Sequence, residues 1–203
     1  MRAKAGVQAG DIQKEAHMSF CLGLINEDKK KYTEAIKFYK RFFFCARLLD
    51  DPIGAALALN RLGVSYHKNN NHQRSLQFHI KHEDFSDQEN VFAAYYNIGM
   101  CMRMIGNTED SLKYFNKALD WANKRTDFES QCVTYGQMGI TNLVAKNFKG
   151  SLGCFKSCYE ICQQMKNSRL QLDCLLCLAY ICYSQNEYQE AIIYFKSAYV
   201  VSC

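Results

Sequence analysis

The stretch RLGVSY at residues 61–66 returns with the same pattern as NIGMCM at 97–102 and QMGITN at 137–142, and weaker copies lie at 21–25 and 177–182. In each copy a large apolar residue comes directly before a small one, and a second small residue follows twelve positions later. These pairs are Gly23 with Ala35, Gly63 with Ser75, Gly99 with Ser111, Gly139 with Ser151, and Ala179 with Ala191. Their first members lie 36 or 40 residues apart, which indicates an internal repeat.

The glycine at the centre of most copies is unusual for a helix, yet the surrounding sequence has helical spacing. The stretch YTEAIKFYKRFFFCARLL at 32–49, for example, places apolar residues three and four apart. Because glycine inside a helix costs about 1 kcal/mol relative to alanine, its return needs a packing reason. We interpret each pair of small residues as the place where the two helices of a hairpin approach closely. The sequence therefore predicts an all-α fold, a right-handed α-solenoid of about five antiparallel helix pairs.

Helix-start signals between the hairpins divide the chain into repeats. Asp51-Pro52 is one such signal, and SDQE at 86–89 and TDFE at 126–129 have the spacing of capping boxes. No proline-rich or glycine-rich linker interrupts the 203 residues. We therefore expect a single array over 1–203, with repeats at about 11–50, 51–85, 86–125, 126–166 and 167–203.

Composition and charge argue against several classes of protein. The formal charge of +5 is spread along the chain, with Lys29–Lys31 as the one tight basic cluster, which disfavours a nucleic-acid-binding surface. No apolar run approaches the roughly 18 residues of a membrane span, and residues 1–16 lack the apolar core of a secretory signal. We therefore expect no nucleic-acid or membrane partner and a cytoplasmic location. The eleven cysteines are interpreted as reduced thiols, because their number is odd and the chain is long.

Two groups of side chains have spacings that a metal site could use. They are the histidines of FHIKHED at 78–84, and Cys154, Cys158, Cys162, Cys174, Cys177 and Cys182. In the repeat register Cys158 falls where two other repeats have alanine. His79 falls in a column of residues that we expect in the core, whose other members are Tyr39, Phe115, Phe155 and Phe195. The histidines lack the H-E-x-x-H spacing, and only Cys174 and Cys177 have the C-x-x-C spacing that zinc ribbons use in pairs. We therefore interpret both groups as packing and expect no metal and no cofactor. Motifs of nucleophilic catalysis and phosphate loops are also absent, so we do not expect an enzyme.

The order of residues in the third repeat carries a family resemblance. It runs Tyr95, Asn97, Ile98 and Gly99, then Ser111, Phe115 and Ala118, and in this order the chain resembles a tetratricopeptide repeat (TPR) array. The spacing of about 40 residues is similar to the longer-repeat class of kinesin light chain and the LGN/Pins adaptors. This resemblance implies a non-catalytic scaffold for protein–protein interaction.

In stacked helix pairs the first helices line a concave surface, where repeat proteins bind extended ligands. The candidate groove residues on that face are Asn60, Arg61, Tyr96, Asn97, Met100, Arg103, Gln137 and Ile140. Arg61, Asn97 and Gln137 hold the same place in successive repeats, and such side chains can bind a peptide main chain and its acidic groups. We therefore expect a protein or peptide partner, with acidic segments favoured. The alternative interpretation is that these are ordinary solvated helix positions.

Two further alternatives concern the partner. Chaperone-binding TPR domains clamp a C-terminal carboxylate, but only Asn97 matches that clamp, so such tails are disfavoured. The second alternative is a structural subunit packed permanently into a cytoskeletal or ciliary assembly. It is favoured by the apolar SAYVVSC at 197–203, which predicts end-to-end self-association or a continuation in a longer chain.

Overall fold

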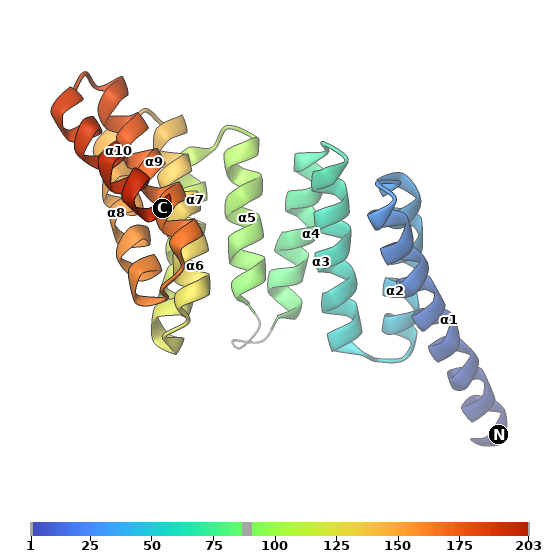
Figure 1. Ribbon diagram of the computed structural model, residues 1–203. Coiled ribbons are helices and arrows are strands. Elements are labelled where there is room, and N and C mark those ends of the chain that lie inside the picture. Colours follow the sequence, from blue (N-terminus) through green and yellow to red (C-terminus); the bar gives the residue numbers. More distant parts are fainter. Residues whose placement is uncertain (1, 87–90, 203) are drawn as a thin grey trace. The chain divides into compact units, whose positions relative to one another are not determined.

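A computed structural model describes the backbone of residues 2–86 and 91–202. In these two ranges the chain forms ten helices and no strand (Figure 1). The helices are α1 (Arg2–Asp28), α2 (Tyr32–Leu48), α3 (Pro52–Lys68), α4 (His72–Phe85), α5 (Phe92–Met104), α6 (Thr108–Arg125), α7 (Phe128–Val144), α8 (Phe148–Gln164), α9 (Ser168–Ser184) and α10 (Tyr188–Ser202). The predicted all-α fold is confirmed.

The helices form two compact units, Met1–Ile105 with α1 to α5 and Gly106–Cys203 with α6 to α10. Within each unit every helix packs against the next one along the chain, so neighbours in sequence are neighbours in space. Four of the predicted hairpins lie inside a unit: α1 with α2, α3 with α4, α7 with α8, and α9 with α10. Among the described residues, no helix combines the length and apolar character needed to cross a membrane.

The repeat glycines make room for a ring on the second helix of the hairpin. A Cβ at position 63 would overlap the imidazole of His79, and one at position 139 would lie 2.7 Å from the ring of Phe155. The small residues opposite add a hydrogen bond, because the hydroxyl of Ser75 donates to the carbonyl of Gly63 at 2.8 Å. The pairing of each glycine with a small residue on the second helix is confirmed. The side chain that requires the glycine, however, is the ring of His79 or Phe155, four residues after Ser75 or Ser151.

Several helices end with a residue in the left-handed conformation and begin with a side-chain cap. Asp51 starts α3 as predicted, since its carboxylate accepts from the N–H of Gly54 at 2.9 Å. The predicted box at 126–129 is displaced by one residue: Thr126 ends α6 with φ 55°, and Asp127 caps α7 by accepting from Ser130. For the box at 86–89, only Ser86 lies in the described residues, and it ends α4.

The two histidines of FHIKHED are part of the packing. His79 is 1% exposed and His82 is 6% exposed. Burial lowers the pKa of His79 to about 3, so its imidazole is neutral at physiological pH. The scaffold interpretation is therefore confirmed for both residues. The aromatic core column fails in the last hairpin, where Phe195 on α10 is 46% exposed.

Candidate functional site

Six of the predicted groove residues lie on two neighbouring helices of the first unit. Asn60 and Arg61 are on α3, and Tyr96, Asn97, Met100 and Arg103 are on α5. All six side chains are partly exposed. The amide of Asn97 donates a 3.1 Å hydrogen bond to the side-chain oxygen of Asn60. The structure therefore brings the polar positions of α3 and α5 together.

Arg61 has an acidic neighbour inside the protein. Its guanidinium lies 3.9 Å from the carboxylate of Glu27 on α1, which is buried. Glu27 also accepts hydrogen bonds from the Tyr39 hydroxyl at 2.7 Å and the Lys68 ammonium at 2.8 Å. Burial alone raises the pKa of Glu27, but the bonds from Lys68 and Tyr39 outweigh it, and the pKa lies below its usual value. Arg61 is thus one of two cations around a buried anion.

Met100 and Arg103 lie on α5 toward its C-terminal end, on the face that also carries Tyr96. An Arg103 Nη2 atom lies 3.3 Å from the sulfur of Met100, and both side chains are half-buried. Burial lowers the pKa of Arg103, although a guanidinium keeps its charge at any physiological pH. One turn earlier, the ring of Tyr96 stacks on that of Phe92 with centroids 5.8 Å apart. Aromatic, sulfur and cationic groups therefore share one helix face.

The remaining predicted residues belong to the second unit. Gln137 is half-buried and Ile140 is 40% exposed, both on α7. The structure thus brings Asn60 and Asn97 into contact within the first unit. The continuous row of Arg61, Asn97 and Gln137 stays a prediction, because its members belong to different units.

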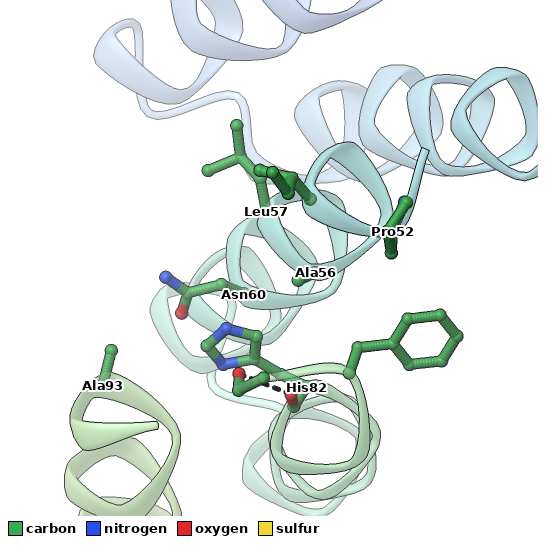
Figure 2. Close-up of a pocket in the computed structure, with 9 residues that line it drawn as sticks. Pro52, Ala56, Leu57, Asn60, His82 and Ala93 are labelled. Carbon is green, nitrogen blue, oxygen red and sulfur yellow. Dashed lines mark hydrogen bonds between the residues drawn. The ribbon is translucent and has the colours of Figure 1, made fainter. Parts of the chain in front are cut away.

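A pocket of about 450 Å³ lies in the first unit among α3, α4 and α5 (Figure 2). Its lining is mostly apolar, and Figure 2 shows Asn60 and the His82 ring side by side, facing Ala93 of α5. The lining residues are Pro52, Ile53, Ala56, Leu57, Asn60, His82, Phe85, Ser86 and Ala93. The Nδ1 atom of His82 is buried and has no hydrogen-bond partner in the described part of the chain.

Of this pocket, sequence reasoning found only Asn60. The missed signal was on α3, where Ile53 and Leu57 precede Asn60 at helical spacing, on the same face. Ile53 lines the pocket and is 81% exposed, which is high for an isoleucine. Two exposed apolar residues in line with a predicted groove residue could have extended the candidate site toward the start of α3.

Taken together, the consecutive helix pairs and the repeat glycines define an all-α helical repeat protein. Residues 92–125 match the family model described as tetratricopeptide repeat, and the predicted resemblance to this family is confirmed. A curated relative, the inactive peptidyl-prolyl cis-trans isomerase shutdown of Bombyx mori, is 33% identical over 100 residues. That match covers 45% of this chain and 23% of the relative, so the chain spans less than a quarter of that protein's length.

Solved structures share the fold over nearly the whole chain. TPR-like repeats of kinesin light chain type from Podosopora anserina have a TM-score of 0.77 at 11% identity, with 95% of both chains covered. A Rap protein complexed with competence and sporulation factor has a TM-score of 0.71 at 16% identity, with 93% of this chain and 54% of that chain covered. At these identities the likeness is one of fold, and it includes the predicted resemblance to kinesin light chain repeats.

Proposed function

We propose that the protein is a non-catalytic scaffold that binds an extended segment of a partner protein across α3 and α5. Asn60 carries this proposal, because it lines the apolar pocket and also accepts the hydrogen bond from Asn97. A segment lying across both helices would place an apolar side chain in the pocket and its main chain beside the two amides. Asparagine side chains can both donate to and accept from a peptide main chain.

The pocket combines a largely apolar wall with the partly exposed amide of Asn60. Such a pocket, apolar with a few polar groups, is typical of ligand sites.

The charges beside the pocket favour an acidic partner. Arg61 and Lys68 share the single carboxylate of Glu27, which leaves this group of three side chains with a net positive charge. Arg103 adds a half-buried cation on α5. A partner's acidic side chains would meet these cations. We further propose that Gln137 and Ile140 on α7 contact a partner in the second unit. That a Rap protein of similar fold is complexed with competence and sporulation factor supports a binding role for such helical arrays.

A peptide library presented to the purified chain tests this function. We expect recovered peptides to share an apolar residue flanked by acids. Asn97→Ala should weaken their binding by about 1–3 kcal/mol, the cost of losing a buried hydrogen bond, and Asn60→Ala should act similarly. The control is Gln77→Ala, which removes an exposed amide from α4. Arg61→Gln should also weaken the binding of acidic peptides. Glutamine is used instead of glutamate because a second carboxylate beside Glu27 would also destabilise the fold. Equal binding by all variants would contradict the proposal.

A second candidate function is a subunit of a permanent assembly, and the exposed apolar face of α10 favours it. On this face Tyr199 is 71% exposed and Val200 is 73% exposed, beside Ile192 and Phe195. Contiguous apolar surface of this kind commonly marks an interface. Sedimentation velocity distinguishes the two functions: an oligomer that Val200→Glu dissociates supports the subunit, whereas a monomer that binds peptides supports the scaffold.

A further inference from the structure

Four cysteines from three helices converge in the interior of the second unit. Cys132 lies on α7, Cys158 and Cys162 lie on α8, and Cys174 lies on α9. The sulfur of Cys132 is 3.2 Å from that of Cys158 and 3.1 Å from that of Cys162, and Cys174 packs in the same cluster. All four are at most 5% exposed. We call this group the thiol cluster.

Spacing along the chain indicated only part of the thiol cluster. Of the six cysteines singled out by spacing, Cys158, Cys162 and Cys174 converge. The others lie elsewhere: the sulfur of Cys154 is 3.7 Å from the amide of Asn142, and Cys177 packs in a different core cluster. Cys132, which the spacing ignored, takes the central place. The interpretation of Cys158 and Cys162 as buried residues is confirmed, but burial alone does not account for their convergence.

Packing alone does not demand thiols at these positions. In the repeat register, the same four places in the first hairpin and the start of the second are filled by Ala16, Phe42, Ala46 and Ala58. All four of these residues are buried, so these four places pack without a sulfur atom, and the one cysteine of that core cluster, Cys45, stands at a different place in the register. At the corresponding places the second unit has four cysteines instead of three alanines and a phenylalanine, and the sulfurs of Cys132, Cys158 and Cys162 lie within 4.8 Å of one another. This concentration of sulfur is what a soft metal ion selects.

We propose that the thiol cluster binds one thiophilic d¹⁰ metal ion, either Zn²⁺ or Cu⁺. Zinc–sulfur bonds of about 2.3 Å place the sulfurs of a tetrahedral site about 3.8 Å apart. The sulfurs at 3.1 Å and 3.2 Å reach that geometry by moving apart about 0.6–0.7 Å. A disulfide, with a bond of about 2.0 Å, would require them to approach by more than 1 Å. As each metal–sulfur bond forms, the thiol releases its proton to water, and no oxidation state changes.

The surroundings of the thiol cluster fit a closed structural site. Gln171 on α9 donates a 3.1 Å hydrogen bond to the carbonyl of Cys162, which ties the two helices together beside the cluster. The side chains of Met165 and Leu170, on either side of the turn between α8 and α9, pack against it. Bound metal would therefore link α7, α8 and α9.

Cobalt titration of the reduced, metal-free chain under anaerobic conditions tests the site. We expect one equivalent of Co²⁺ to produce the thiolate-to-cobalt charge-transfer band and the intense visible bands of a tetrahedral site, and one equivalent of Zn²⁺ to remove them. A parallel titration with Cu⁺ and a competing chelator shows which ion binds more tightly. Metal should also protect three or four thiols from alkylation and raise the melting temperature by several degrees.

The variants isolate the thiol cluster from the other cysteines. Cys132→Ala and Cys158→Ala should each abolish the cobalt bands. Alanine occupies the place of Cys158 in two other repeats, so that variant is expected to fold, as circular dichroism would verify. Cys45→Ala, a buried thiol of the first unit, should leave binding unchanged. Cys182→Ala should do so as well, which separates the cluster from the group that Cys182 forms with Glu187 and Glu190.

Three outcomes would overturn the proposal. The first is a wild-type protein without cobalt–thiolate bands whose thiols are alkylated equally with and without metal. The second is cobalt binding that survives Cys132→Ala and Cys158→Ala. The third is a mass showing the loss of two hydrogens under mild oxidation, with a disulfide mapped to Cys132 and no metal bound by the reduced chain. Thiol protection is measured on the wild type, so the first outcome needs no variant to fold.

Discussion

The imidazole of His79 occupies the space where a side chain at Gly63 would begin. This contact reverses the usual effect of replacing a helical glycine. Gly63→Ala should destabilise the protein by about 1–3 kcal/mol, because overpacking outweighs the gain of about 1 kcal/mol in helix propensity. Gly153→Ala on α8 is the matched control, since nothing lies within 4 Å of its new Cβ, and it should be neutral or stabilising. Urea unfolding measures the free energy of unfolding of both variants. An equal change in the two would show that the His79 ring moves aside without cost.

The hydrogen bond from Ser75 to the Gly63 carbonyl should stabilise the fold about as much as a typical protein hydrogen bond. Ser75→Ala removes the donor at 2.8 Å from a fully buried site, so we expect a loss of about 1 kcal/mol in the free energy of unfolding. The equivalent change, Ser151→Ala, removes a 2.9 Å bond to Gly139 and should cost the same. A loss in only one hairpin would show that the two bonds are not equivalent.

Stability should fall on mild acidification because of His79. Its pKa of about 3 in the folded protein lies below that of an unfolded histidine, so the unfolded state binds the proton more readily. The free energy of unfolding therefore decreases as pH falls below about 6.5, by up to roughly 2 kcal/mol at pH 5, and this contribution is constant at higher pH. Nδ1 of His79 has no hydrogen-bond partner among the described residues that would stabilise the charged form.

His79→Phe isolates this contribution. Phenylalanine holds the same place in the fourth repeat, where Gly139 accommodates Phe155. The variant should fold, and its stability should change less between pH 7 and pH 5 than that of the wild type. The remaining slope reports His67 and His82, whose pKa values are also lowered by burial. An unchanged slope in the variant would assign the pH dependence to those two histidines.

Removing the charge of Glu27 should destabilise the first unit. Glu27→Gln leaves the cations of Lys68 and Arg61 near each other without their shared carboxylate, and we expect a loss of about 1–3 kcal/mol. The control is Glu34→Gln, which breaks an exposed pair with Lys37 and should change little. Thermal unfolding at low and high salt compares the stability of the two variants. If Glu27→Gln were as stable as Glu34→Gln, water would be compensating for the lost contacts of Glu27 with Lys68 and Arg61.

The fold could be predicted because its signal is periodic. Small residues at a fixed interval identified the hairpins, and two of the three helix-start signals could be placed to within one residue. The reason for the glycines could not be predicted, because which side chain reaches position 63 depends on the rotamer of His79 and not on spacing. Phe195 was wrongly assigned to the core, since a sequence column does not show how far each of its members is covered by neighbouring helices.

The candidate site could be predicted only in part. Asn60 and Asn97 were both placed on the predicted inner face, but Asn60 is three residues before Gly63 and Asn97 is two before Gly99. Their contact therefore joins adjacent columns of the register and could not be read from matching positions. The internal acid beside Arg61 comes from Glu27 on α1, and no local pattern connects these two positions. The same limit applies to Cys132, which meets Cys158 only because α7 and α8 pack side by side. Contacts between helices depend on helix rotation, which a single sequence leaves open.

The position of Glu27 has a consequence for how the array unfolds. Repeat proteins behave approximately as one-dimensional chains in which each unit is coupled to its nearest neighbours, and their ends tend to fray. Glu27 belongs to the first hairpin, yet it is bonded to Lys68 at the end of α3 in the second. Fraying of α1 would strip the buried anion from both hairpins at once. The first two hairpins should therefore open as one cooperative block, which native-state hydrogen exchange would reveal as a shared opening free energy for α1 and α3.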